Sequence, residues 1–189
     1  PPVVVKDTFY VNEGDTLTVL NSDIDLIINN DIDPDNLTSE LSAQLMIPPS
    51  YHSGIFGIGS KGAFQYIHNC NDADVDVFQY LVSDGTATSS FQDSVIIFIL
   101  NEAPFGEPDF YSVQNGQTLT VDELSGALSN DLDSNSCDVL RVKLVQPPSY
   151  HLGSFTLDST GALSYIHDGT LTPTQESITS SLPSSTANE

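Results

Sequence analysis

The sequence predicts an all-β protein made of two tandem β-sandwich domains, the second of which is incomplete. Three observations lead to this prediction. The apolar segments are short, rich in β-branched and aromatic residues, and separated by Gly, Pro, Asn and Asp. A series of motifs recurs in the same order about 100 positions later, which indicates an internal repeat. The second copy lacks counterparts of the last strands of the first.

The repeat rests on motifs that are nearly identical in the two copies. They include Thr-Leu-Thr-Val, Asn-Asp-x-Asp, Pro-Pro-Ser-Tyr-His and Tyr-Ile-His, and the distance between the paired motifs barely changes along the chain. The matched segments are 2–19 and 104–121, 30–33 and 130–133, 48–52 and 147–151, and 66–68 and 165–167.

Alternation along the first copy predicts individual strands. Phe78, Tyr80 and Val82 are separated by single residues, so we expect them to share the buried face of one strand. The Ser-Asp-Gly sequence at 83–85 then predicts a turn. Residues 95–100 are apolar on both faces, which predicts a strand that is covered on both sides or lies against a neighbour.

The second copy is expected to have the same strands up to about residue 167. Leu140, Val142 and Leu144 are predicted to face inward, while Arg141 and Lys143 face water. We therefore expect domains at residues 1–102 and 103–170, and a Ser/Thr/Pro-rich tail at 171–189.

No residues after Tyr165 match segment 76–80 or the closing strand 94–100. Three explanations stay open: the chain is cut, residues 176–182 pair in place of a missing strand, or another copy donates an extended segment such as 2–11. We hypothesise the third, which would make the protein a subunit of a head-to-tail homopolymer through strand addition.

In the first copy the motifs read Pro-Val-x-x-x-Asp, Val-x-Glu-Gly, Asn-Asp-x-Asp-Pro-Asp, Asp-x-Phe-x-Tyr-x-Val-Ser-Asp-Gly and Asn-x-Ala-Pro. This series resembles the bacterial cadherin-like or Ig-like tandem repeat of surface adhesins and secreted multidomain proteins. The resemblance covers residues 2–104 and again 104 to about 167. It implies Ig-like/cadherin-like sandwiches of seven strands arranged in arrays, located outside the cell or at its surface, and it favours calcium as a ligand.

The charge is strongly acidic, with 26 Asp and Glu against 4 Lys and Arg and a net charge of −22. Such a polyanion repels nucleic acid and anionic membranes, and it favours divalent cations. The apolar runs are too short to span a bilayer, so no membrane span is expected.

A calcium site is predicted in the loop that begins at Asn30. Asp31, Asp33 and Asp35 alternate there, so one bent loop could direct several oxygens at a single cation. The alternative is that these aspartates make Asx-turns. Further ligands would come from Glu13, Asp72, Asp74, Asp76 or Asp84. In the second copy Asp131 and Asp133 persist, but Ser134 and Asn135 replace the Pro and Asp, which predicts a weaker site or none.

No catalytic function is predicted. The histidines occur as matched pairs, His52 with His151 and His68 with His167, so we expect them to cap turns or to hydrogen-bond across strand ends. No nucleophile motif, phosphate loop or zinc signature occurs.

The predicted function is structural or adhesive, with other copies of the repeat or other proteins as partners. The main alternative is a carbohydrate-binding accessory module, for which exposed aromatic rings are the usual evidence. Tyr51/Tyr150 and Tyr66/Tyr165 recur in both copies, which favours scaffold roles for them. The sequence leaves open whether Cys70 and Cys137 are bridged and whether the sequon at Asn36 carries a glycan.

Overall fold

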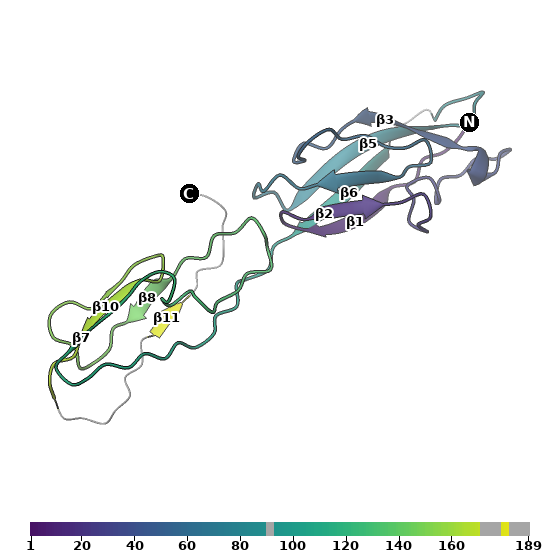
Figure 1. The fold of residues 1–189 in the computed structure, drawn as a ribbon. Coiled ribbons are helices and arrows are strands. Elements are labelled where there is room, and N and C mark those ends of the chain that lie inside the picture. Colours follow the sequence, from purple (N-terminus) through teal and green to yellow (C-terminus); the bar gives the residue numbers. More distant parts are fainter. Residues whose placement is uncertain (90–92, 171–178, 182–189) are drawn as a thin grey trace. The chain divides into compact units, whose positions relative to one another are not determined.

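The computed structural model describes residues 1–89, 93–170 and 179–181, and within these it is all-β apart from the single 3₁₀ turn η1 (Thr38–Glu40). The chain divides into two compact units (Figure 1). The first consists of Pro1–Asn101 with Asn135–Cys137, and the second of Glu102–Ser134 with Asp138–Glu189. The all-β prediction is confirmed, while the domain limits expected from the sequence stay predictions.

The first unit is a sandwich of two sheets (Figure 1). One sheet has the order β1-β6-β5-β3, in which β1 runs parallel to β6 and the other neighbours are antiparallel. The other sheet pairs β2 with β4 in antiparallel fashion. The strands are β1 (Asp7–Asn12), β2 (Thr16–Val19), β3 (Ser42–Ile47), β4 (Phe64–Ile67), β5 (Val75–Ser83) and β6 (Asp93–Leu100).

The core of the first unit lies between these sheets. Phe78, Tyr80 and Val82 are fully buried on the inner face of β5, as the alternation predicts. β6 lies between β1 and β5, so both of its edges are paired as expected, but the residues of its outer face are only partly covered. The buried apolar cluster consists of Val11, Val19, Leu26, Ile27, Ile28, Leu41, Phe56, Phe64, Tyr66, Phe78, Tyr80, Val82, Val95, Ile97 and Ile99.

The second unit repeats part of this sandwich. Its three-stranded sheet has the order β7-β10-β9, in which β7 and β10 pair as β2 and β4 do in the first unit. β8 matches β3 by sequence and pairs with β11. The strands are β7 (Thr118–Val121), β8 (Lys143–Gln146), β9 (Thr156–Leu157), β10 (Leu163–Ile166) and β11 (Thr179–Ser181).

β11 takes the place next to β8 that β5 takes next to β3, and both pairings are antiparallel. Of the three explanations left open by the sequence, the described residues therefore match pairing by part of segment 176–182. Residues 176–178 and 182 lie outside the described residues. Donation of a strand by another copy stays a prediction.

Residues 109–113 match β1 in sequence but form no strand. β1 is held by its parallel pairing with β6, and the described part of the second unit contains no strand equivalent to β6. The core of this unit is correspondingly small. Its buried apolar residues are Val121, Ala127, Val142, Leu163 and Tyr165.

Matched glycines show that the two units share their turns as well as their strands. Gly62 and Gly161 both have positive φ, 86° and 90°. A side chain at Gly62 would meet Ile27, and one at Gly161 would lie 2.9 Å from the backbone nitrogen of Leu128. Both positions therefore require glycine for conformation and for space.

Cys70 and Cys137 form a disulfide, which settles a point that the sequence left open. Cys70 follows β4, and Cys137 belongs to the short segment Asn135–Cys137 that packs with the first unit. Asn135 in this segment is buried, and its side-chain amide donates to the Leu100 carbonyl at 3.2 Å. The disulfide thus fixes a piece of the second repeat's sequence to the first unit.

Candidate functional site

The predicted calcium loop begins with a carboxylate that points inward. Asp31 is 3% exposed, and its Oδ1 accepts a hydrogen bond from the backbone N–H of Val5 at 2.8 Å. The hydroxyl of Tyr80 lies 3.3 Å from the same oxygen and 3.2 Å from Oδ2. Asp31 therefore ties the loop to the first segment of the chain and to the core strand β5.

A second buried carboxylate, Asp7, lies against the same tyrosine. Its Oδ2 is 3.0 Å from the Tyr80 hydroxyl, and its Oδ1 accepts from the side-chain amide of Asn30 at 2.9 Å. Burial and the charges of Asp7 and Asp31 raise the pKa of Tyr80 far above its usual value, so the phenol stays protonated. Asp7 was not among the predicted ligands, although its recurrence as Asp109 was a usable signal.

The other two aspartates of the loop lie elsewhere. Asp33 Oδ1 accepts from the backbone N–H groups of Asp35 and Asn36 at 3.0 and 2.9 Å, which is an Asx-turn. Burial works against ionisation of Asp33, but these two hydrogen bonds lower its pKa. Asp35 is exposed, and its hydrogen bond with Asp33 and the Asp33 charge raise its pKa. The turn described by the alternative prediction is therefore present.

The second unit repeats the first of these arrangements. The backbone N–H of Glu107 donates to Asp131 Oδ1 at 2.8 Å, the distance found between Val5 and Asp31. Burial, followed by the charge of Asp131, raises the pKa of Asp109. The matching phenol is Tyr111, which contacts Asp109 and whose pKa rises to about 12 through burial and the Asp109 charge. In the second unit a tyrosine from a different position, Tyr111, thus contacts the counterpart of Asp7, as Tyr80 does in the first unit.

Asp133 also occupies the place expected from the repeat. The residue before it, Leu132, makes an isolated bridge with Phe105, as Ile32 before Asp33 does with Val3. Both aspartates are partly buried. The repeat therefore conserves the backbone of this loop as well as its carboxylates.

The further ligands proposed from the sequence are spread over the first unit. Glu13 is buried and accepts from the side-chain amide of Asn101 at 2.6 Å. Asp76 is buried and accepts from the backbone N–H groups that follow Pro49, while Asp84 caps its own turn. Asp72 and Asp74 are exposed. Of these side chains, Asp84 lies near enough to the loop for its charge to raise the pKa of Asp35.

Calcium needs six to eight oxygens around one point. Asp33 Oδ2 is suited to a cation, because it is buried and accepts no hydrogen bond in the described structure, and the N-terminal nitrogen of Pro1 lies 3.9 Å from it. Asp31 is directed toward Tyr80 instead, and no group of three or more His, Cys, Asp or Glu side chains among the described residues could hold a metal. The arrangement therefore supplies one suitable oxygen from this loop, and calcium binding stays a prediction.

Comparison with known families agrees with the sandwich of the first unit. A family model described as a bacterial Ig domain matches residues 1–97, half of the chain. The chain belongs to the bacterial Ig domain family. The resemblance found in the motifs of the first repeat is thereby confirmed.

One solved structure supports the fold of this bacterial Ig domain protein. A Drosophila N-cadherin fragment, EC1-3, matches with a TM-score of 0.51 and 11% identity over 97% of this chain. The chain spans 59% of the length of that fragment. Human protocadherin-24 EC1-2 matches with a TM-score of 0.40 and 15% identity, covering 100% of this chain and 98% of the other.

An endo-fucoidan hydrolase of glycoside hydrolase family 107 also matches, at a TM-score of 0.35 and 16% identity, with 98% of this chain and 27% of the enzyme covered. TM-scores below 0.5 support no argument about fold or function. No curated protein sequence matches the chain. Within the described residues, no helix is long and apolar enough to cross a membrane.

The histidines of the Ig domain are parts of turns. His68 is buried, its Nδ1 accepts from the Gly14 N–H at 3.0 Å, and its Nε2 lies 3.1 Å from the Asn71 side chain. In the second unit, His167 Nδ1 accepts from the Gly169 N–H at 3.0 Å. The predicted role of the histidines in turns and strand ends is confirmed.

The recurring tyrosines hold the same turns. Tyr66 is fully buried, and its hydroxyl donates to the Tyr51 carbonyl at 3.1 Å. The hydroxyl of Tyr165 donates to the Tyr150 carbonyl at 2.8 Å. Tyr66 and Tyr165 are buried and cannot offer a ring to a ligand at the surface, so their scaffold role is confirmed.

Proposed function

We propose that this chain is an extracellular structural or adhesive module without catalytic activity. The observation that carries the proposal is the duplicated hydrogen bond, Val5 to Asp31 and Glu107 to Asp131, at 2.8 Å in both units. Polar side chains that could have formed a reactive site are instead occupied in holding the same loop twice. A repeat built in this way suits a spacer or an adhesive array.

The Cys70–Cys137 disulfide supports a location outside the cytosol, because disulfides persist in oxidising compartments. The net charge of −22 supports it as well, since an acidic surface keeps an array soluble and separate from nucleic acid.

Exposure on intact cells tests the proposal. Antibodies against the chain should bind cells of the source organism before lysis, and an external protease should abolish that binding. Deleting residues 1–189 from the gene in frame should weaken attachment of the cells to surfaces. Binding of antibody only after lysis would contradict the proposal.

Assembly through strand addition is part of the proposal. Residues 109–113 have no strand partner among the described residues, whereas the matching β1 pairs with β6. An added strand would satisfy the backbone groups of that edge. Sedimentation of the full chain should show mass that increases with concentration, and a constant monomer mass over a hundredfold range would rule the assembly out.

A carbohydrate-binding accessory role is the second candidate. It is favoured by an exposed aromatic side chain, Tyr10, that occurs in the first repeat and is replaced by Ser112 in the second.

A further inference from the structure

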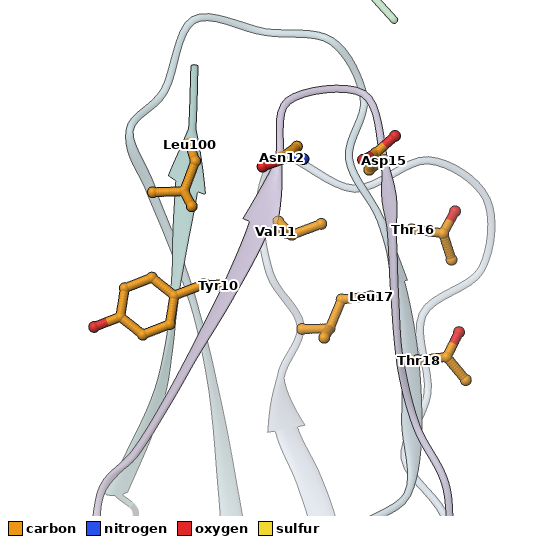
Figure 2. Close-up of a pocket in the computed structure, with 8 residues that line it drawn as sticks. All are labelled: Tyr10, Val11, Asn12, Asp15, Thr16, Leu17, Thr18 and Leu100. Atoms are coloured by element: carbon orange, nitrogen blue, oxygen red, sulfur yellow. The ribbon is translucent and has the colours of Figure 1, made fainter. Parts of the chain in front are cut away.

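A surface groove of about 270 Å³ lies between β1 and β2 in the first unit. Figure 2 shows Tyr10 and Leu100 on one side of it, Thr16 and Thr18 on the other, and Val11 and Leu17 between them. Asn12 and Asp15 lie at the end where β1 turns into β2 (Figure 2). The groove therefore combines an apolar floor with hydroxyl, amide and carboxylate groups.

Tyr10 offers a supported aromatic ring at this groove. Its side chain is 61% exposed, and its ring is stacked on that of Phe98, with centroids 5.4 Å apart and planes inclined by 19°. Phe98 is the register partner of Tyr10 on β6. One face of the tyrosine is thus held by Phe98 while the ring remains largely exposed, so little conformational freedom is lost when a ligand stacks on it.

Tyr10 has no counterpart in the second repeat. Four of the groove residues recur at the matching positions of the second repeat, whereas Tyr10, Asn12 and Asp15 do not. Val113, Thr118, Leu119 and Thr120 repeat Val11, Thr16, Leu17 and Thr18, while Ser112, Gln114 and Gln117 replace Tyr10, Asn12 and Asp15. The largely exposed ring of Tyr10 therefore belongs to the first unit alone, where Phe98 on β6 supports it.

We propose that this groove binds a neutral saccharide. The C–H face of a sugar ring is apolar and stacks on Tyr10, while the sugar hydroxyls, which both donate and accept, meet Asn12, Asp15 and Thr16. The carboxylate of Asp15 and the net charge of −22 disfavour an anionic sugar and also a second copy of the chain. The volume is near the lower end for ligand sites, so contact with one sugar ring is expected.

This inference goes beyond the structural role, which requires no ligand at the groove. Saccharide binding can therefore fail while exposure on intact cells is confirmed, and the reverse also holds.

Affinity electrophoresis of the full chain in native gels tests the proposal. The gels contain one polysaccharide each: hydroxyethylcellulose, galactomannan, dextran or laminarin as neutral probes, and alginate as the anionic probe. At least one neutral polysaccharide should retard the protein, and alginate should not.

Variants assign the retardation to the groove. Tyr10→Ser, which introduces the residue of the second repeat, should weaken the binding about tenfold or more, the size expected for losing a central aromatic contact. Tyr10→Phe keeps the ring and should retain most of the binding. Phe110→Ser removes a more exposed ring from the second unit and should leave the retardation unchanged.

The proposal is overturned by any of three results. The first result is that no neutral polysaccharide retards the wild type. The second is that the Tyr10→Ser variant is retarded as strongly as the wild type and has the same melting temperature. The third result is that the mobility of the wild type depends on protein concentration in gels without polysaccharide and that Tyr10→Ser removes this dependence. That result would assign the ring to self-association instead.

Discussion

The hydroxyl of Tyr80 lies 3.0 Å from Oδ2 of Asp7 inside the first repeat, where both residues are buried. The same hydroxyl lies 2.8 Å from the Ile27 carbonyl and 3.2 Å from Asp31 Oδ2. One phenol thus joins the first strand, the acidic loop and the core strand β5.

Tyr80→Phe should lower the free energy of unfolding by about 2 kcal/mol, because it removes the shared donor and leaves buried carboxylate oxygens with fewer partners. Urea unfolding at neutral pH measures the change. Tyr10→Phe removes a hydroxyl from an exposed side chain and should change stability by less than about 0.5 kcal/mol. Equal stabilities of the two variants would contradict this account of Tyr80.

Asp76→Asn should destabilise the first repeat by about 3 kcal/mol. The buried carboxylate accepts from the backbone N–H groups of Ser50 and Tyr51 at 2.8 and 2.7 Å, and from the Tyr66 hydroxyl at 3.1 Å. The asparagine side chain keeps one acceptor oxygen. Its NH₂ group replaces the other oxygen and would face a hydrogen-bond donor. The matched control, Asp74→Asn, alters an exposed aspartate two residues away. Urea unfolding should show no loss for this control, and a similar loss for both would point to net charge instead.

Reduction of Cys70–Cys137 should lower the free energy of unfolding by roughly 4 kcal/mol, the loop-entropy estimate for a closed loop of this size. The disulfide joins residues 67 positions apart. Unfolding of the wild type with and without dithiothreitol gives the difference. The Cys70→Ser/Cys137→Ser double variant should resemble the reduced wild type and should not respond to dithiothreitol. A response of the double variant would show that the reagent acts elsewhere.

Calcium should raise the melting temperature of the full chain if the sequence prediction is correct, with half-saturation at roughly 10⁻⁴ to 10⁻³ M, as in extracellular modules. Asp33→Ala removes the buried oxygen that has no donor and should abolish the increase. Sodium chloride at matched ionic strength controls for screening. An unchanged melting temperature in calcium would exclude the site.

The second repeat should be most stable in mildly acidic solution. The raised pKa of Asp109 means that the folded state binds its proton more tightly than the unfolded state does. The resulting contribution to stability is fully present below pH 3.8, and it is lost as the pH rises through the pKa of Asp109 in the folded state. Hydrogen bonds from Thr160 and Thr170 lower the pKa values of Asp158 and Asp168, so their contributions exist above 3.8 and are lost as the pH falls below it.

Hydrogen exchange of the Leu163 and Tyr165 amides in β10, corrected for intrinsic rates, measures this dependence between pH 4 and 7. Protection should rise as the pH falls from 7 toward 4, and Asp109→Asn should remove that rise. Protection that falls over this range in the wild type would show that the sign is wrong.

Much of the fold was predictable because most segments of the first repeat have a counterpart in the second, so each pattern could be compared between two copies. The alternation of Phe78, Tyr80 and Val82 correctly predicted a buried strand face, since side chains of a strand alternate between its two sides. The pairing of Thr179–Ser181 with β8 could only be left among alternatives, because a short polar segment carries no alternating apolar pattern.

The candidate site was less predictable. Alternating aspartates were expected to converge on one cation, but alternate residues of an extended loop can take different partners, as Asp31 and Asp33 do. The Cys70–Cys137 disulfide joins positions that the repeat does not match, so periodicity gave no sign of it. Tyr10 was not predicted as a ligand contact, because it does not recur in the second repeat and its stacking on Phe98 depends on the pairing of β1 with β6.

The disulfide also determines how the protein responds when its two ends are pulled apart. Force applied at the ends passes through the bond from Cys70 to Cys137 and bypasses everything between them, including β5, β6 and β7. A chain extends by at most about 3.5 Å per residue, so the 67 residue steps between the cysteines hold back roughly 230 Å of extension. Under tension the oxidised protein is a shorter and stiffer tether, and its full length becomes available only after reduction.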